Sequence, residues 1–168
     1  MKHNLLLFLA GILPLLVSCA SQSVPLASVG PHPLAGYSST GETGSLLVFS
    51  DREPSSEGDN PPFYQRTDYE IYNAAGKRVS YVDNVVGYYN SFPRLVWLQP
   101  GRYTVKARAK DGLSFNIPVL IELDRTTKVH LDKNWAPPAG TPKGVLVTTP
   151  GGYPAGWRSD PPAKPTKG

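Results

Sequence analysis

The chain has 168 residues, enough for one domain, and 18 of them are proline and 16 glycine. The formal net charge is only +4 and the motifs of common RNA-binding modules are absent, so nucleic acid is not an expected partner. A single cysteine excludes an intramolecular disulfide and a thiolate zinc site. Proline and glycine gather towards the two ends, which predicts a folded middle between disordered flanks.

The N-terminus has the pattern of a secretory signal peptide. Lys2 provides a positive charge, and an apolar run of 13 residues follows from Leu5 to Val17. As a helix this run would be about 20 Å long, short of the roughly 30 Å hydrocarbon core of a bilayer. We therefore expect residues 1–18 to be removed as a signal peptide and not to span a membrane.

The end of this run resembles the cleavage box of bacterial lipoproteins, with the segment Leu16-Val17-Ser18-Cys19. The resemblance implies cleavage before Cys19, a diacylglycerol thioether on its sulfur and acylation of the new amino group. Several acyl chains anchor stably, because each buried methylene contributes about 0.8 kcal/mol. An Asp after the cysteine tends to retain such proteins at the inner membrane, so Ala20 favours the outer membrane of a diderm cell. The alternative is an ordinary buried cysteine after a plain signal peptide.

Two flanking segments lack a sustained strand or helix period. Residues 19–43 are rich in Ser, Pro and Gly and predict a flexible tether that holds the domain about 25–30 Å from the lipid. His32, within it, has no expected role. Residues 134–168 hold eight prolines and six glycines and predict an extended, mildly basic tail. Inside this tail, residues 145–149 are strand-like, and they either pair with a sheet edge or form an extended link.

Residues 44–133 consist of short β-type runs with turn signals between them. Residues 45–50 are apolar on both faces, and residues 67–73 and 78–82 form a hairpin with Gly76 at its turn. Further strands are expected over residues 94–98, 102–109, 115–121 and 127–132. About seven strands with no convincing helix predict an all-β fold, either a single small antiparallel β-sandwich or a small barrel.

Alternation in the later strands assigns their side chains to two faces. Lys128, His130 and Asp132 are predicted to point outward. Pro118, on the outward face of its strand, favours an edge position or a bulge. The predicted inward side chains are Tyr103, Val105, Ala107, Ala109, Phe115, Ile117, Val119, Ile121, Val129 and Leu131.

Residues 98–105, with the sequence Leu-Gln-Pro-Gly-Arg-Tyr-Thr-Val, resemble the turn and core-tyrosine strand of prealbumin-like β-sandwich modules. These modules include the carboxypeptidase regulatory-like and PEGA-type domains. The turn at Asp111-Gly112 and the closing run 127–132 fit the same pattern. The resemblance covers roughly residues 44–133 and implies a prealbumin-like or Ig-like sandwich, but it does not imply a function.

No motif of the common enzyme classes is present: there is no zinc-protease helix motif, no phosphate-binding Gly-rich loop and no serine nucleophile elbow. We therefore expect no catalytic residue, no metal site and no cofactor, and we interpret His130 as a solvated strand residue. The acidic residues of loop 51–60 offer oxygen ligands for calcium, but they match no known calcium loop, so a solvated loop is the preferred interpretation.

Aromatic residues in two predicted loops are candidate ligand contacts: Tyr64, Tyr88, Tyr89 and Phe92. Aromatic rings in loops stack on sugars or on partner side chains, and the alternative role is to cap the open end of the sandwich.

A second candidate contact is a row of cations on one strand face: Arg102, Lys106, Arg108 and Lys110. Such a row either meets an anionic polymer or lipid surface, or pairs with acids on a neighbouring strand such as Asp68 and Glu70. It also protects a sheet edge against aggregation.

These features predict a lipid-anchored protein of the bacterial cell envelope with a non-enzymatic binding or structural β-sandwich. Expected partners are the membrane, through lipid on Cys19, and an envelope polysaccharide, peptidoglycan or another envelope protein. The alternative function is a carbohydrate-binding module that uses the loop tyrosines and Trp97 or Trp157. A lesser alternative is an enzyme of unrecognised type.

Overall fold

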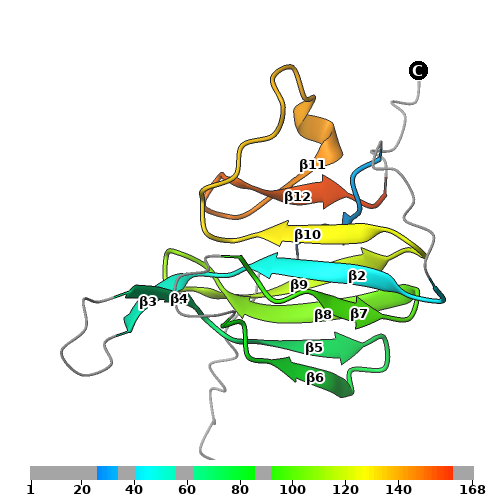
Figure 1. Ribbon diagram of the computed structural model, residues 1–168. Coiled ribbons are helices and arrows are strands. Elements are labelled where there is room, and N and C mark those ends of the chain that lie inside the picture. The colour runs from blue at the N-terminus through cyan, green and yellow to red at the C-terminus, as the bar shows by residue number, and fades with distance from the viewer. Residues whose placement is uncertain (1–25, 34–40, 56–62, 86–91, 161–168) are drawn as a thin grey trace, which may run out of the picture.

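The computed structural model describes residues 26–33, 41–55, 63–85 and 92–160, and within them the protein is all-β (Figure 1). The described elements are twelve strands and one short 3-10 helix, η1 (Lys143–Val145). The predicted all-β sandwich is confirmed, with more strands than the seven expected. The predicted signal peptide, Cys19 and the end of the tail from residue 161 lie outside the described residues.

Seven strands form the larger sheet. In spatial order they are β11 (Leu146–Thr148), β12 (Pro154–Arg158), β1 (Val29–Gly30), β9 (Ser114–Ile121), β8 (Gly101–Arg108), β5 (Tyr69–Asn73) and β6 (Arg78–Val82). The predicted hairpin is the β5–β6 pair, and Gly76 at its turn has the expected positive φ of 73°. Further along the chain, β8 and β9 pair over their full eight residues.

A smaller sheet packs on the larger one and contains β10 (Thr126–His130), β2 (Gly44–Phe49) and β7 (Val96–Leu98), in that order. It lies in front of the larger sheet in Figure 1. A separate two-stranded ribbon, β3 (Arg52–Ser55) with β4 (Phe63–Arg66), projects from one end. Two strand pairs, β10–β2 and β1–β9, are parallel, so the expectation of a purely antiparallel sandwich was wrong on this point.

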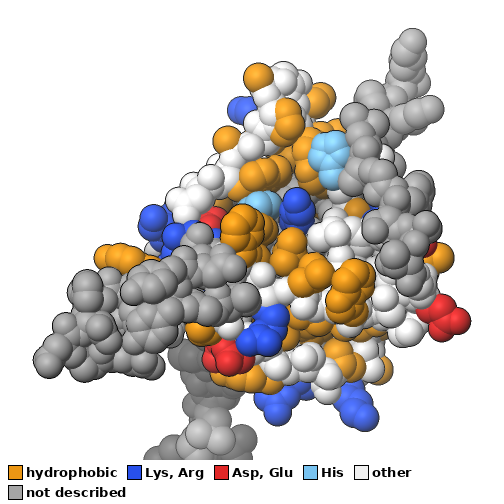
Figure 2. Space-filling view, in the orientation of Figure 1, with side chains coloured by type: hydrophobic (Ala, Val, Ile, Leu, Met, Phe, Trp, Pro, Cys, Tyr) orange, Lys and Arg blue, Asp and Glu red, His pale blue; other side chains and the backbone are white. Residues whose placement is uncertain are grey.

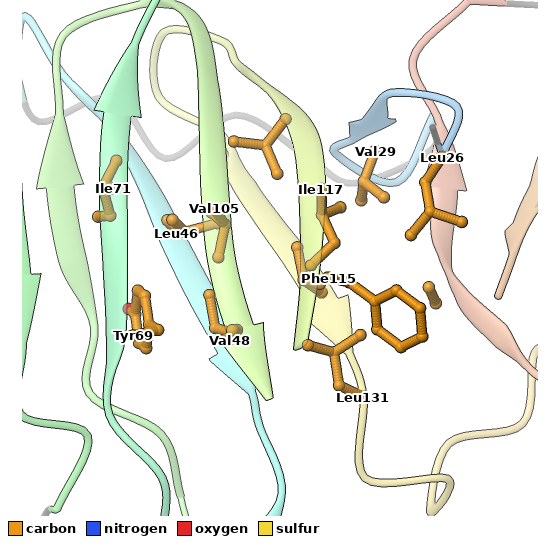
Figure 3. Close-up of a cluster of buried hydrophobic side chains, with 14 of the residues drawn as sticks. Leu26, Val29, Leu46, Val48, Tyr69, Ile71, Val105, Phe115, Ile117 and Leu131 are labelled. Atoms are coloured by element: carbon orange, nitrogen blue, oxygen red, sulfur yellow. The ribbon is translucent and has the colours of Figure 1, made fainter. Parts of the chain in front are cut away.

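The core lies between the two sheets. Leu46 and Val48 of β2 join one buried cluster with Ile71, Val105 and Ile117 of the larger sheet (Figure 3). Burying each such side chain stabilises the fold by about 1.5–3 kcal/mol. Nine of the ten predicted inward side chains are buried, and the tenth, that of Tyr103, is partly buried.

The domain boundaries predicted at residues 44 and 133 need correction, because strands on both sides of them belong to the larger sheet. β1 lies inside the predicted tether, and β11 and β12 lie inside the predicted tail; Val29 and Ala155 are completely buried. Gly156 makes this packing possible, since a Cβ there would lie 2.6 Å from Val29 Cγ1 and 2.8 Å from the carbonyl oxygen of Lys128. Residues 145–149 contain β11, so they do extend a sheet edge.

Pro118 also differs from its prediction, because β9 lies between β8 and β1 and is not an edge strand. β1 has only two residues and meets β9 at one register position, Val29 opposite Val119. Few ladder hydrogen bonds therefore form between β9 and β1, so the sheet tolerates a proline, which has no backbone N–H, at position 118.

In the part of the chain that the structure describes, no helix has the length and apolar character needed to cross a bilayer.

Candidate functional site: an aromatic stack with a pocket

Aromatic rings from four separate segments meet over the outer face of the smaller sheet. Along this series the ring centroids are 4.4 Å apart for His32 and Trp157, 6.2 Å for Trp157 and Trp135, 4.5 Å for Trp135 and His130, and 4.4 Å for His130 and Phe49. We call these five residues the aromatic track. Figure 2 shows both described histidine side chains, in pale blue, among hydrophobic side chains on this face.

Strand register places the two rings at the Phe49 end of the aromatic track. Phe49 and His130 are register partners at the ends of the parallel strands β2 and β10, so their side chains project from the same face and their rings stack with planes 13° apart. After β10 the chain turns back through Lys133, whose φ of 60° is left-handed. This turn brings Trp135 onto the other face of His130, with planes 12° apart.

The other end of the aromatic track comes from the two segments outside the predicted domain. Trp157 lies on β12, and His32 follows Pro31, which makes an isolated bridge with Thr127 of β10. The side chain of Arg125 donates a hydrogen bond to the backbone oxygen of His32. The track therefore depends on the close packing of the N-terminal and C-terminal segments against the smaller sheet.

His130 does not have the solvated position that the strand pattern predicted. Its side chain does point to the outer face, but Phe49 and Trp135 cover both faces of its ring and the residue is buried. Burial lowers the pKa of His130 to about 4, an effect that the nearby carboxylate of Asp132 opposes and the charges of Lys128 and Arg66 reinforce. The imidazole is therefore neutral near pH 7.

This shifted pKa predicts a pH-dependent stability. Between the usual pKa of 6.5 and about 4, the unfolded chain holds a proton on His130 that the folded chain does not. The free energy of unfolding therefore falls as the pH is lowered through this window, by at most about 3 kcal/mol. We expect His130→Phe to reduce this loss, as measured by urea unfolding at pH 7 and pH 4.5. Equal losses in the variant and the parent would contradict the account.

A pocket of about 270 Å³ opens at the Phe49 end of the aromatic track. Its lining combines rings, two guanidinium groups and polar side chains: Phe49, Arg52, Arg66, Phe92, His130, Asp132, Asn134 and Trp135. Since both faces of His130 are covered, this ring can present only its edge to the pocket. The edge of a neutral imidazole carries one N–H donor and one acceptor nitrogen, so it suits polar ligand groups.

A buried ion pair between Arg66 and Asp132 forms one wall of this pocket. Arg66 Nη2 lies 3.0 Å from Asp132 Oδ2, and the two side chains are only 3% and 5% exposed. Arg66 also donates a hydrogen bond from Nη1 to the Ser50 backbone oxygen at 2.8 Å, and its guanidinium lies 4.9 Å from the centre of the Phe49 ring. Burial lowers the pKa of Arg66, while the pairing with Asp132 opposes this effect, and the guanidinium keeps its charge. Asp132 was predicted only to point outward, and the structure shows in addition that it is buried.

Asp132 is well supplied with hydrogen-bond donors. Besides Arg66, the backbone N–H and the side-chain amide of Asn134 donate to its two oxygens at 3.2 and 3.3 Å. The left-handed turn at Lys133 makes these bonds possible by placing Asn134 back over the carboxylate. The same turn thus orients Trp135 and stabilises the buried charge.

Of the aromatic residues predicted to contact a ligand, some lie at the pocket or in the aromatic track and others lie elsewhere. Phe92 lines the pocket and is 66% exposed, and Trp157 belongs to the aromatic track. Tyr64 is 65% exposed on β4 but is not among the pocket-lining residues. Trp97 is 59% exposed and lies opposite Ser45, at the other end of β2 from Phe49. Tyr88 and Tyr89 lie outside the described residues.

The predicted row of cations largely faces carboxylates. Lys106 lies 4.0 Å from Glu70, Arg102 lies 3.5 Å from Asp160, and Arg108 pairs with Glu53 and lies 3.8 Å from Asp51. Lys110 is exposed. The row therefore has the neighbouring acids that the alternative interpretation required, Glu70 among them, and contact with an anionic surface remains a prediction.

The acidic loop gains no support as a metal site from its described part. Asp51 accepts a hydrogen bond from the Arg52 backbone N–H at 2.8 Å, and Glu53 pairs with Arg108. Among the described residues, no group of three His, Cys, Asp or Glu side chains is placed to hold a metal ion. Residues 56–60 of this loop lie outside the described ranges.

No protein-family model, curated protein or solved structure matches this chain.

Sequence reasoning missed most of this site, for two reasons. Arg66 and Asp132 are 66 residues apart, and no local pattern links them. Trp135 and Trp157 were assigned to a disordered tail, although large aromatic residues are unusual in segments that do not fold. That compositional signal was the one available indication that residues after 133 pack against the domain.

Proposed function

We propose that this chain is a lipid-anchored protein of the bacterial cell envelope, at the outer membrane in a diderm cell, and that its β-sandwich is a non-enzymatic binding module. The observation that carries the anchor is the lipobox-like segment Leu16–Cys19 at the end of the apolar run. The pocket beside the aromatic track supports the binding role, because concave sites lined by rings and a few polar groups are typical of ligand binding.

The anchor also constrains where the module lies. Only six residues separate Cys19 from Leu26, which is already buried in the core. Even fully extended, this stretch spans at most about 25 Å, since each residue adds up to roughly 3.6 Å. A lipid on Cys19 would therefore hold the sandwich closer to the bilayer than a free tether of residues 19–43 would.

The anchor is tested by replacing Cys19 with Ser. In a bacterial host supplied with labelled palmitate, we expect Cys19→Ser to remove the label completely and to move the protein from the membrane fraction to the soluble fraction. Ser21→Ala, two residues away and outside the lipobox-like segment, is the matched control and should keep both. Label retained in Cys19→Ser would disprove the proposed attachment site.

A carbohydrate ligand is the more specific form of the binding role. Phe92 offers an exposed ring at the pocket, and Trp135 and Trp157 are partly exposed beside it. Aromatic rings with polar side chains around them are suited to sugars, which have apolar C–H faces and polar hydroxyl rims. The pocket is thus a second place for the alternative function, beside the predicted loop tyrosines, of which Tyr88 and Tyr89 lie outside the described residues.

A further inference from the structure

The charges around the pocket do not cancel. Two guanidinium groups, from Arg52 and Arg66, line it together with the single carboxylate of Asp132. His130 adds no charge near neutral pH, because burial keeps its ring neutral. Asp132 already faces Arg66 and Asn134. The described lining of the pocket thus carries one positive charge more than it carries negative ones.

Arg52 is the cation that this arrangement leaves available. It lies directly opposite Arg66 in the β3–β4 ribbon, and like charges at opposed positions destabilise a strand pair. Among the described residues, the Arg52 side chain has no hydrogen bond and no ion pair. A bound anion would offset the repulsion between the two opposed guanidinium groups.

The remaining lining limits the size and kind of the anion. A guanidinium presents a planar fork that matches a carboxylate through two parallel hydrogen bonds. The single excess charge suits one carboxylate. The volume of about 270 Å³ suits one ring and not a whole oligomer, and the exposed ring of Phe92 provides a surface for that ring to contact.

We infer that the pocket binds one carboxylate-bearing sugar residue of an acidic polysaccharide, with Arg52 facing the carboxylate and Phe92 contacting the sugar ring. This inference rests on the proposed binding function and specifies its ligand class. The rest of the polysaccharide would continue out of the pocket, since the described site has room for only one of its residues.

The test uses residues 19–168 with Cys19→Ser, which include every described residue, and titration calorimetry with two probes. One probe is trigalacturonic acid, and the other is the same trisaccharide with its carboxylates reduced to alcohols. We expect the acid to bind at least tenfold more tightly. Arg52→Gln should reduce that preference to less than twofold and leave the affinity for the reduced sugar unchanged. Arg102→Gln, which removes a cation from the exposed pair with Asp160, is the matched control and should keep the preference.

A variant that removes the ring of Phe92 tests sugar binding in general, apart from the preference for acidic sugars. Phe92→Ala removes an exposed side chain, so the fold should be retained, and it should weaken both probes at least tenfold. Equal affinity of the unsubstituted protein for the two probes would overturn the acidic-sugar inference while supporting sugar binding as such. The inference would also be overturned if neither sugar probe bound. If the acidic peptide triglutamate bound and the sugars did not, the pocket would be assigned to a protein partner and the proposed binding role would be retained.

Discussion

Replacing Arg66 with Met is expected to lower the free energy of unfolding by about 3–5 kcal/mol. The substitution leaves the carboxylate of Asp132 buried without its counter-ion and removes the donor to the Ser50 backbone oxygen. Both losses come from groups that are shielded from water, so solvent cannot replace the missing partner. Urea unfolding followed by tryptophan fluorescence measures the change.

Two further variants show whether the uncompensated charge is the cause. The double variant Arg66→Met with Asp132→Leu removes the buried carboxylate as well, and it should recover a large part of the lost stability. Arg78→Met breaks an ion pair with Glu70 at the surface and should leave the unfolding free energy nearly unchanged. If Arg66→Met behaves like Arg78→Met, the ion pair with Asp132 does not stabilise the fold as described.

The second large effect is expected at Val29. This side chain is completely buried in β1, between β9 and β12, in a segment that the sequence pattern assigned to a tether. Val29→Asp would place an unpaired carboxylate in the core and should cost on the order of 4 kcal/mol. The loss should be visible as a lower midpoint of thermal unfolding.

Val79→Asp is the matched control for Val29. It makes the same chemical change on the edge strand β6, where the valine is 46% exposed, and should have a much smaller effect. A Val29→Asp protein as stable as the Val79→Asp protein would contradict the placement of β1 in the sheet.

Long strands with strict alternation could be predicted from the sequence because burial itself produces the pattern. β8 and β9 each have eight residues and pair along their whole length, so their inward positions repeat often enough to be recognised. Gly76 is similar, because a tight turn between two strands needs a residue that tolerates positive φ. Local sequence and final packing agree in these elements.

Short strands could not be predicted in the same way. β1 has two residues and is held by partners at residues 119 and 157–158, so its strand conformation comes from tertiary contacts and not from its own residues. At His130 the alternation correctly predicts that the side chain points to the outer face, but it does not predict that the side chain is buried there. The outer face there is covered by a later part of the chain, and alternation along one strand contains no information about such a cover.

The candidate site was predictable only in part for the same reason. Phe92 was selected from the sequence as an aromatic residue in a loop, and it does line the pocket. The side chains that give the pocket its charge and depth come from the β3–β4 ribbon and from the turn after β10, and these two segments are far apart in the sequence. Their meeting depends on the β3–β4 register and on the left-handed turn at Lys133.

We propose that the aromatic track and its pocket form the binding surface of an envelope protein. The most direct measurement is co-sedimentation of the Cys19→Ser protein with purified peptidoglycan sacculi and with acidic envelope polysaccharide. Phe92→Ala with Trp135→Ala alters the pocket, and Tyr81→Ala with Trp97→Ala removes two exposed rings elsewhere. The account predicts that only the first pair abolishes binding to at least one polymer. Binding that survives the first pair, or that is lost equally in both pairs, would contradict it.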